Sequence, residues 1–137
     1  VRGQAALEVA AIVAFAVLLL LLSQVRVVQE SVRLQELAAG GEAEGLASRL
    51  SVAVVSAAAY DGFATVVQMP ASLRGEPYNV AFTNASVIVS WNPDGVERSA
   101  YASHGFVDVR NASGASAFTI GPSTITIGSD GGEVIVS

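Results

Sequence analysis

The feature that most constrains this chain is an almost uninterrupted apolar run near its N-terminal end. Between residues 5 and 22 every residue is apolar except Glu8. At 1.5 Å per residue the run would form a helix of about 27 Å, close to the roughly 30 Å core of a bilayer. The apolar core of a secretory signal peptide is shorter, about 7–15 residues. A helix of this composition therefore needs lipid or other apolar protein surface around it.

The helix is predicted to continue well past this run. The segment after Leu22, SQVRVVQESVRLQEL, contains good helix formers and no proline. Arg26, Glu30 and Arg33 recur at helical spacing and form one stripe of alternating charge. Apolar residues occupy several other sides of the same segment, namely Val25, Val27, Val28, Val32 and Leu34. Apolar residues on several sides indicate a helix with several neighbours.

Three glycines then interrupt the pattern, and each destabilises a helix by about 1 kcal/mol relative to alanine. Gly40, Gly41 and Gly45 therefore predict a kink or a loosened turn. Beyond them a single apolar stripe resumes and is expected to lie on a core, with polar residues opposite. The stripe is Leu46, Leu50, Val54 and Ala57, and the polar side is Glu42, Arg49 and Ser56. The helix is expected to end near Tyr60, before the turn signal Asp61-Gly62.

From Phe63 onward the hydrophobic period becomes two, which is typical of strands. The runs are FATVVQM, VIVSW, GFVDVR, STITIG and EVIVS, and turn signals separate them. Residues 92–95, Asn-Pro-Asp-Gly, fit a type I turn, and residues 129–132 mark another. We therefore expect an α+β chain in which residues 1–60 form a hydrophobic helix and stalk. Residues 61–137 are expected to form a small antiparallel β-sandwich of the immunoglobulin-like kind, with Trp91 in its core.

Composition excludes several classes of function. The net charge of −5 and the absence of lysine leave no basic patch for nucleic acid. No cysteine is present, and the single histidine, His104, lies in a predicted turn, so a zinc site is not expected. No motif frames a catalytic serine, histidine or aspartate. We expect no enzyme activity, no cofactor and no metal.

The stretch RGQAALE, followed by the apolar run and a β domain, resembles the class III signal-peptide region of archaeal type IV pilins. The matching residues are Arg2, Gly3, Gln4 and Glu8, whereas Ala6 stands where the family usually has serine. The resemblance in architecture covers the whole chain. It implies a processing motif of Gly3, Gln4 and Glu8, read by a membrane-embedded signal peptidase. Cleavage after Gly3 would make Glu8 the fifth mature residue, and a mature chain starting at Val1 is the alternative.

The resemblance further implies a major pilin of an extracellular, cell-surface archaeal type IV-like pilus, with adhesion as its task. The precursor would be inserted transiently in the membrane before the assembly machinery builds a helical homopolymer. Burial of the apolar run would supply roughly 20–30 kcal/mol as an upper estimate. Glu8 would meet Arg2 or the amino terminus of a neighbouring copy, or else remain solvated near the helix end. The residues expected to pack in the filament core are Ala5, Leu7, Val9, Ile12, Val13, Phe15, Val17, Leu18, Leu19, Leu20, Leu21 and Leu22.

Two Asn-Ala-Ser sequons, at Asn84 and Asn111, are candidate N-glycosylation sites. Two other functions fit the same sequence. One is a single-span membrane-anchored extracytoplasmic binding domain, which would remain a monomer. The other is an archaellum filament subunit, which shares the plan of a pilin. Fibres in sheared cell-surface material would separate both filament proteins from the anchor.

Overall fold

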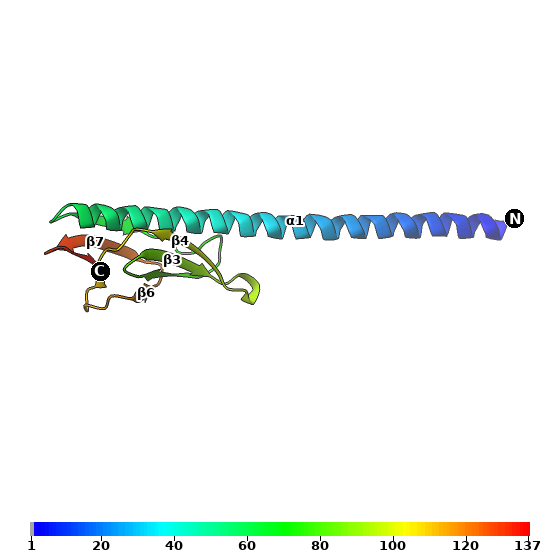
Figure 1. Ribbon diagram of the computed structural model, residues 1–137. Coiled ribbons are helices and arrows are strands. Elements are labelled where there is room, and N and C mark those ends of the chain that lie inside the picture. The colour runs from blue at the N-terminus through cyan, green and yellow to red at the C-terminus, as the bar shows by residue number, and fades with distance from the viewer. Residues whose placement is uncertain (1) are drawn as a thin grey trace. The chain divides into compact units, whose positions relative to one another are not determined.

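The computed structural model describes residues 2–137, except for the side chain of Arg2. Its first element is one α-helix, α1 (Arg2–Ala59), which is drawn from blue to green in Figure 1. The predicted end near Tyr60 is confirmed. Gly62 has a φ of 75°, a left-handed conformation that suits glycine after a helix, and the Phe63 amide donates to the Tyr60 carbonyl at 3.1 Å.

The predicted kink at the three glycines is wrong, because α1 runs through Gly40, Gly41 and Gly45 without a break. Residues interleaved with these glycines are buried, among them Ala39, Ala43 and Leu46. Their burial offsets the poor helix propensity of glycine, of about 1 kcal/mol each. Tertiary packing therefore overrides local preference in this stretch.

Eight strands follow α1 and form two sheets of four strands each. The first sheet has the order β1-β7-β8-β5, and the second has the order β4-β3-β2-β6. In chain order the strands are β1 (Ala64–Gln68), β2 (Tyr78–Phe82), β3 (Ser86–Trp91), β4 (Arg98–Ser103), β5 (Val109–Asn111), β6 (Phe118–Ile120), β7 (Thr124–Asp130) and β8 (Glu133–Val136). The expected fold class, a long apolar helix followed by a β-sandwich, is confirmed.

Details of the sandwich differ from the expectation. The strands β2, β4 and β6 fall outside the runs recognised in the sequence. In β4 only Ala100 is buried, so the strand carries almost no hydrophobic signal. β5 pairs with β8 in parallel, with Val109 opposite Val134, so the sandwich is not purely antiparallel. A three-residue strand at a sheet edge is too short to show its direction in sequence.

The turns also show one correction. The expected type I turn over residues 92–95 is wrong by one position, because the Val96 amide donates to the Pro93 carbonyl at 2.9 Å. Asp94 and Gly95 have φ values of 53° and 80°, which is the type I′ pattern. Such turns match the twist of a hairpin, here between β3 and β4. The second expected turn, residues 129–132, joins β7 to β8 through Gly131 and Gly132.

A single core connects the end of α1 with both sheets. The helix contributes Ala43, Leu46, Ala47, Leu50, Ala53, Val54 and Ala57, and the strands contribute residues such as Val80, Phe82, Val89, Ile127 and Val134. The predicted stripe of Leu46, Leu50, Val54 and Ala57 is thus buried as expected, and so is Trp91. Ser51 Oγ donates to the Ser103 carbonyl at 3.0 Å and ties the helix to the end of β4. Figure 1 shows the sheets beside this part of α1.

The chain divides into two compact units, Val1–Glu36 and Leu37–Ser137. The expected boundary at residue 60 follows the end of the helix, whereas the compact units follow the packing. The part of α1 that begins at Leu37 belongs with the sheets because its buried face completes their core.

Candidate functional site

The candidate site is the exposed apolar surface of α1 in the first unit. Large apolar side chains from Leu7 to Leu34 are between 42% and 73% exposed. All twelve predicted filament-core residues, from Ala5 to Leu22, lie exposed on this helix. They occupy every side of it, because an unbroken run of residues winds around the whole circumference. The described part of the chain offers nothing that covers them.

This surface requires an apolar partner. The helix Gly3–Ala59 contains a window that is long and apolar enough to cross a membrane, and that window is 0% buried. A contiguous apolar surface of this kind is far larger than the patches that soluble monomers expose. The segment can be covered by lipid, by other copies of itself, or by each in turn.

A second exposed strip lies on the outer side of α1, where the helix covers the β-sandwich. The expected position of Glu42, Arg49 and Ser56 on this side is wrong, because the helical spacing places those three at the flanks of the core face. The side opposite the core carries small residues and valines instead, with one hydroxyl and no charge. We call it the outer strip: Gly41, Gly45, Ser48, Val52, Val55 and Ala59. Val52 is 62% exposed, and the three-and-four spacing of the strip is visible in the sequence.

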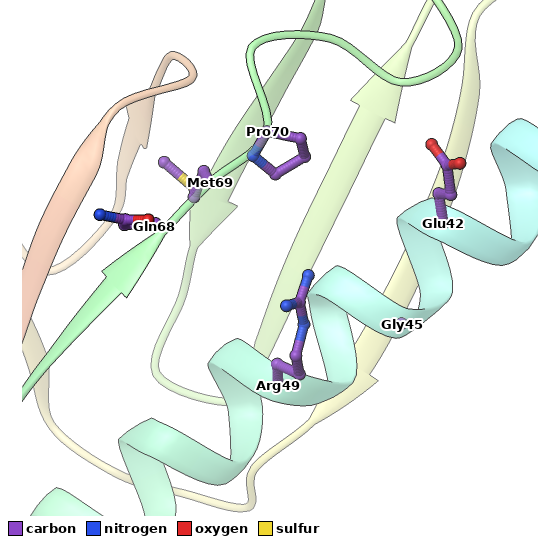
Figure 2. Close-up of a pocket in the computed structure, with 6 residues that line it drawn as sticks. All are labelled: Glu42, Gly45, Arg49, Gln68, Met69 and Pro70. Carbon is purple, nitrogen blue, oxygen red and sulfur yellow. The ribbon is translucent and has the colours of Figure 1, made fainter.

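A hollow in the second unit lies between α1 and the end of β1. Its cavity volume is about 760 Å³, and it is lined by Glu42, Gly45, Arg49, Gln68, Met69 and Pro70. Figure 2 shows Gly45 between Glu42 and Arg49 along α1, with the Arg49 side chain extending toward Pro70. Glu42 Oε1 is held by Arg74 Nε at 2.8 Å. One acid, one base and a thioether in an open groove frame no recognisable reaction.

The processing-motif residues Gly3, Gln4 and Glu8 lie exposed in the first turns of α1. Among the described side chains no ion pair involves Glu8. The expected partners of Glu8, Arg2 and the amino terminus, lie outside the residues whose side chains are described. Their pairing with Glu8 stays a prediction.

The two sequons differ in how the fold holds the asparagine. Asn84 is exposed in the turn between β2 and β3, and its Oδ1 accepts one long bond of 3.4 Å from the Val109 amide. Asn111 is half-buried at the end of β5, and its Oδ1 accepts bonds from the Ser113 amide and hydroxyl and from the Ala115 amide. Asn111 therefore organises its own turn. Asn84 is the more accessible acceptor, and glycosylation at both sites stays a prediction.

His104 follows β4 in the predicted turn but is 6% exposed. Neither ring nitrogen has a hydrogen-bond partner among the described residues. Burial lowers the pKa of the imidazole, and nearby backbone groups of Thr83 and Ser86 oppose this only in part. In the described residues, 2–137, no group of three histidine, aspartate or glutamate side chains is placed to hold a metal ion.

Comparison with known proteins adds no relative: no family model, no curated protein and no solved structure matches the chain. The class of the molecule is therefore set by its own fold, an α+β chain with an exposed apolar helix joined to a β-sandwich.

Proposed function

We propose that this chain is the structural subunit of an extracellular filament of the archaeal type IV pilus kind. In this proposal the apolar helices of many copies pack together as the filament core, and the β-sandwiches form its surface. The membrane holds the helix only before assembly. The single observation that carries the proposal is the exposure of apolar residues on every side of α1 from Leu7 to Leu37.

The length of the exposed apolar surface along α1 supports a protein partner for part of it. The apolar run at residues 5–22 matches a bilayer in length, but exposed valines and leucines continue beyond it at Val25, Val28, Val32 and Leu37. These residues alternate with Arg26, Glu30, Arg33 and Glu36. Charged residues at this density do not enter a bilayer core, so the valines among them require protein neighbours.

The outer strip supports a polymer over a solitary anchored domain. An anchored monomer exposes the helix beside its sandwich to water, and charged and polar residues would be expected on that side. Val52 and Val55 lie there instead, between Gly41 and Ala59, and Ser48 is the one polar residue of the strip. Glycine, alanine and serine are small enough to let helices approach closely, and valines between them add buried area at such a contact.

The task we propose for the filament is attachment of the cell. Two aromatic side chains stand out from the sandwich, Tyr101 on β4 at 77% exposure and Phe106 in the following loop at 100%. Aromatic side chains are enriched at protein binding surfaces because they bury much area with little loss of side-chain freedom. They support contact of the filament surface with other surfaces.

The test compares Val52→Glu with Val66→Glu in the full chain expressed in its native cell. The two valines have nearly equal exposure, 62% and 63%, but Val52 lies on the outer strip and Val66 on β1. Filaments in sheared cell-surface material are counted by negative-stain microscopy, and mass spectrometry identifies the chain in the fibres and in the membrane.

Val52→Glu is expected to lower filament yield at least tenfold, about 1.4 kcal/mol, because it buries an unpaired carboxylate between copies. Val66→Glu is expected to leave the yield near that of the wild type. Both variants should enter the membrane normally, since neither changes the apolar run. If the wild-type chain is found only as a membrane monomer and never in fibres, the anchored binding domain is the correct description.

A further inference from the structure

In the proposed filament, the carboxylate of Glu8 needs a partner. It is the only charged residue in the apolar run, and it is exposed with no ion pair among the described side chains. If the run packs among other helices, this carboxylate leaves water. A buried carboxylate is strongly destabilising unless a cation and hydrogen-bond donors meet it. The partner must come from another copy, because α1 cannot fold back on itself.

The choice of cation is narrow. The chain has no lysine, so apart from the amino terminus every candidate with a permanent positive charge is an arginine. Arg74 is held by Glu42 at 2.8 Å, and Arg110 is held by Asp108 at 3.0 Å. Arg98 also has an interaction of its own. Among the described side chains this leaves Arg26, Arg33 and Arg49.

The surroundings of these three arginines distinguish them. The groove beside Arg49 also contains Glu42, which would repel an incoming carboxylate. Arg33 has an acid three residues away on each side, Glu30 and Glu36, within one helical turn. Arg26 has Glu30 alone at such a spacing. It is also the arginine that follows most closely after the apolar run.

Arg26 lies in a shallow groove on α1 with a cavity volume of about 510 Å³. Its lining is Leu19, Leu22, Ser23, Val25, Arg26 and Gln29. The guanidinium and the Gln29 amide supply donors, while the leucines and Val25 supply apolar walls. The Ser23 hydroxyl already donates to the Leu20 carbonyl at 2.8 Å. This is the environment that a carboxylate flanked by Leu7 and Ile12 would need.

The spacing along the helix makes the surface complementary to a shifted copy of itself. Glu8 and Arg26 are separated by about five helical turns, roughly 27 Å, and therefore lie on the same side of α1. Ile12, Phe15, Leu19 and Leu22 connect them at three-and-four spacing. The result is an apolar strip with an acid at one end and a base at the other. A parallel copy displaced by that distance brings unlike charges to the same level.

We propose that Glu8 of each subunit pairs with Arg26 in the Leu19–Gln29 groove of a second copy, displaced by about 27 Å along the filament axis. The inference rests on the proposed filament, since it names the partner of the same apolar surface. The pair neutralises the carboxylate where water is excluded and sets the axial register of neighbouring helices. A polar pair inside an apolar contact acts in this way in coiled coils, where it selects one register among several.

The test uses full-length chains in the native cell and follows filament yield. Glu8→Arg and Arg26→Glu are each expected to lower the yield at least tenfold, because each places like charges together. The double variant with both changes should restore the yield to within about threefold of the wild type. Glu8→Arg combined with Arg33→Glu is the matched control, with the same charges at the next arginine, and it should not recover.

Since Glu8 also belongs to the processing motif, the mature N-terminus of every variant is read by mass spectrometry. If Glu8→Arg fails to mature, the neutral set replaces it: Glu8→Gln, Arg26→Gln and the double variant. Pairing requires that Arg26→Gln weakens filaments less in the Glu8→Gln background than in the wild type. Additive losses in the neutral set, or recovery with Arg33→Glu, would overturn the inference.

The two proposals fail in different ways. If wild-type fibres contain this chain but their cryo-electron-microscopy structure places Glu8 away from Arg26, the pairing is wrong and the filament stands. If the wild-type chain forms no fibres, the filament proposal fails and the pairing fails with it. A density map showing Glu8 against Arg26 of a copy displaced by about 27 Å supports both.

Discussion

Both ends of α1 contain leucines, but the surroundings of these leucines are opposite. Near the front, Leu18, Leu20 and Leu22 are more than half exposed, whereas Leu46 and Leu50 near the end are fully buried. A leucine near the end of α1 therefore packs against its own chain, whereas a leucine near the front of the same helix does not. A covered leucine stabilises the folded subunit, and an uncovered one is available to stabilise an assembly.

The comparison extends to the outer side of the buried half. There the helix has one face in the core and, on the opposite side, the outer strip with Val52 and Val55. A helix end that only closed a soluble domain would need one apolar face. In the proposed filament, the exposed valines on this second side would extend the contacts between copies over the sandwich half of α1, so the two halves are tested separately.

The largest difference in unfolding free energy should appear when a leucine is replaced by alanine in each half of α1, in two separate variants. Leu50→Ala is expected to destabilise the β-sandwich unit by about 2–5 kcal/mol, because Leu50 is fully buried in its core. Leu20→Ala, at an exposed position, should change the unfolding free energy of the detergent-solubilised subunit by less than about 0.5 kcal/mol. Urea unfolding followed by tryptophan fluorescence measures both, because Trp91 is the only tryptophan and is buried in the core.

Filament assays should then separate the roles of the two leucines. Leu20→Ala should weaken the filament, lowering its melting temperature, while leaving the subunit intact. Equal losses of subunit stability from both substitutions would show that the front of α1 is packed against its own chain, which would contradict the distinction between the halves.

A change of pH is expected to have a smaller effect on the free energy of unfolding, and this effect should be confined to the β-sandwich unit. Burial lowers the pKa of His104 below its ordinary value of 6.5, so the unfolded chain takes up a proton at a higher pH than the folded chain. The contribution of neutral His104 to the free energy of unfolding is therefore fully present above pH 6.5. It falls as pH decreases through that value toward the lower pKa of the folded state. His104 is the only histidine, so the urea midpoint should change with pH between about 7.5 and about 5.5 through this group.

His104→Leu is the matched variant for this titration. It removes the ionisable ring and should give a urea midpoint that is nearly independent of pH over the same range. A wild-type midpoint that rises on acidification would mean that the folded state binds the proton more tightly, and the stated direction would be wrong.

The parts of the fold with a strong period were predictable from sequence. The apolar stripe of Leu46, Leu50 and Val54 fixed the buried helix face, and the alternation in VIVSW placed Val87, Val89 and Trp91 inside. The fold class followed from these patterns. The exposed surface of the first unit was equally predictable, because no second apolar segment of the sequence was long enough to cover it.

The rest depended on tertiary context. Nothing in RSAYAS indicates that β4 exists, because its place is set by pairing with β3 along Ser86–Trp91. The parallel pairing of β5 with β8 joins residues distant in sequence and leaves no local signal. The helix propensity of the glycines predicts a kink, but the packing of Ala39, Ala43 and Leu46 around them keeps α1 continuous, and this packing depends on the whole fold. The spacing of the outer strip is visible in the sequence, but the charges of Glu42 and Arg49 suggest a polar side opposite the core, whereas these two residues flank the core face.

The smallest expected effect on stability is that of a single methyl group added on the outer strip. This change gives the most sensitive comparison between the stability of the subunit and that of the filament. Gly41 is exposed inside α1, and an added Cβ would meet no atom within 4 Å. Gly41→Ala should therefore raise the unfolding free energy of the subunit by about 0.5–1 kcal/mol through better helix propensity. In the filament the same methyl group would stand where a neighbouring helix approaches, so the filament melting temperature should fall. Opposite signs for subunit and filament would show that Gly41 is retained for assembly, because a residue that served only the helix would improve both. An increase in both would mean that no second copy approaches this strip at Gly41.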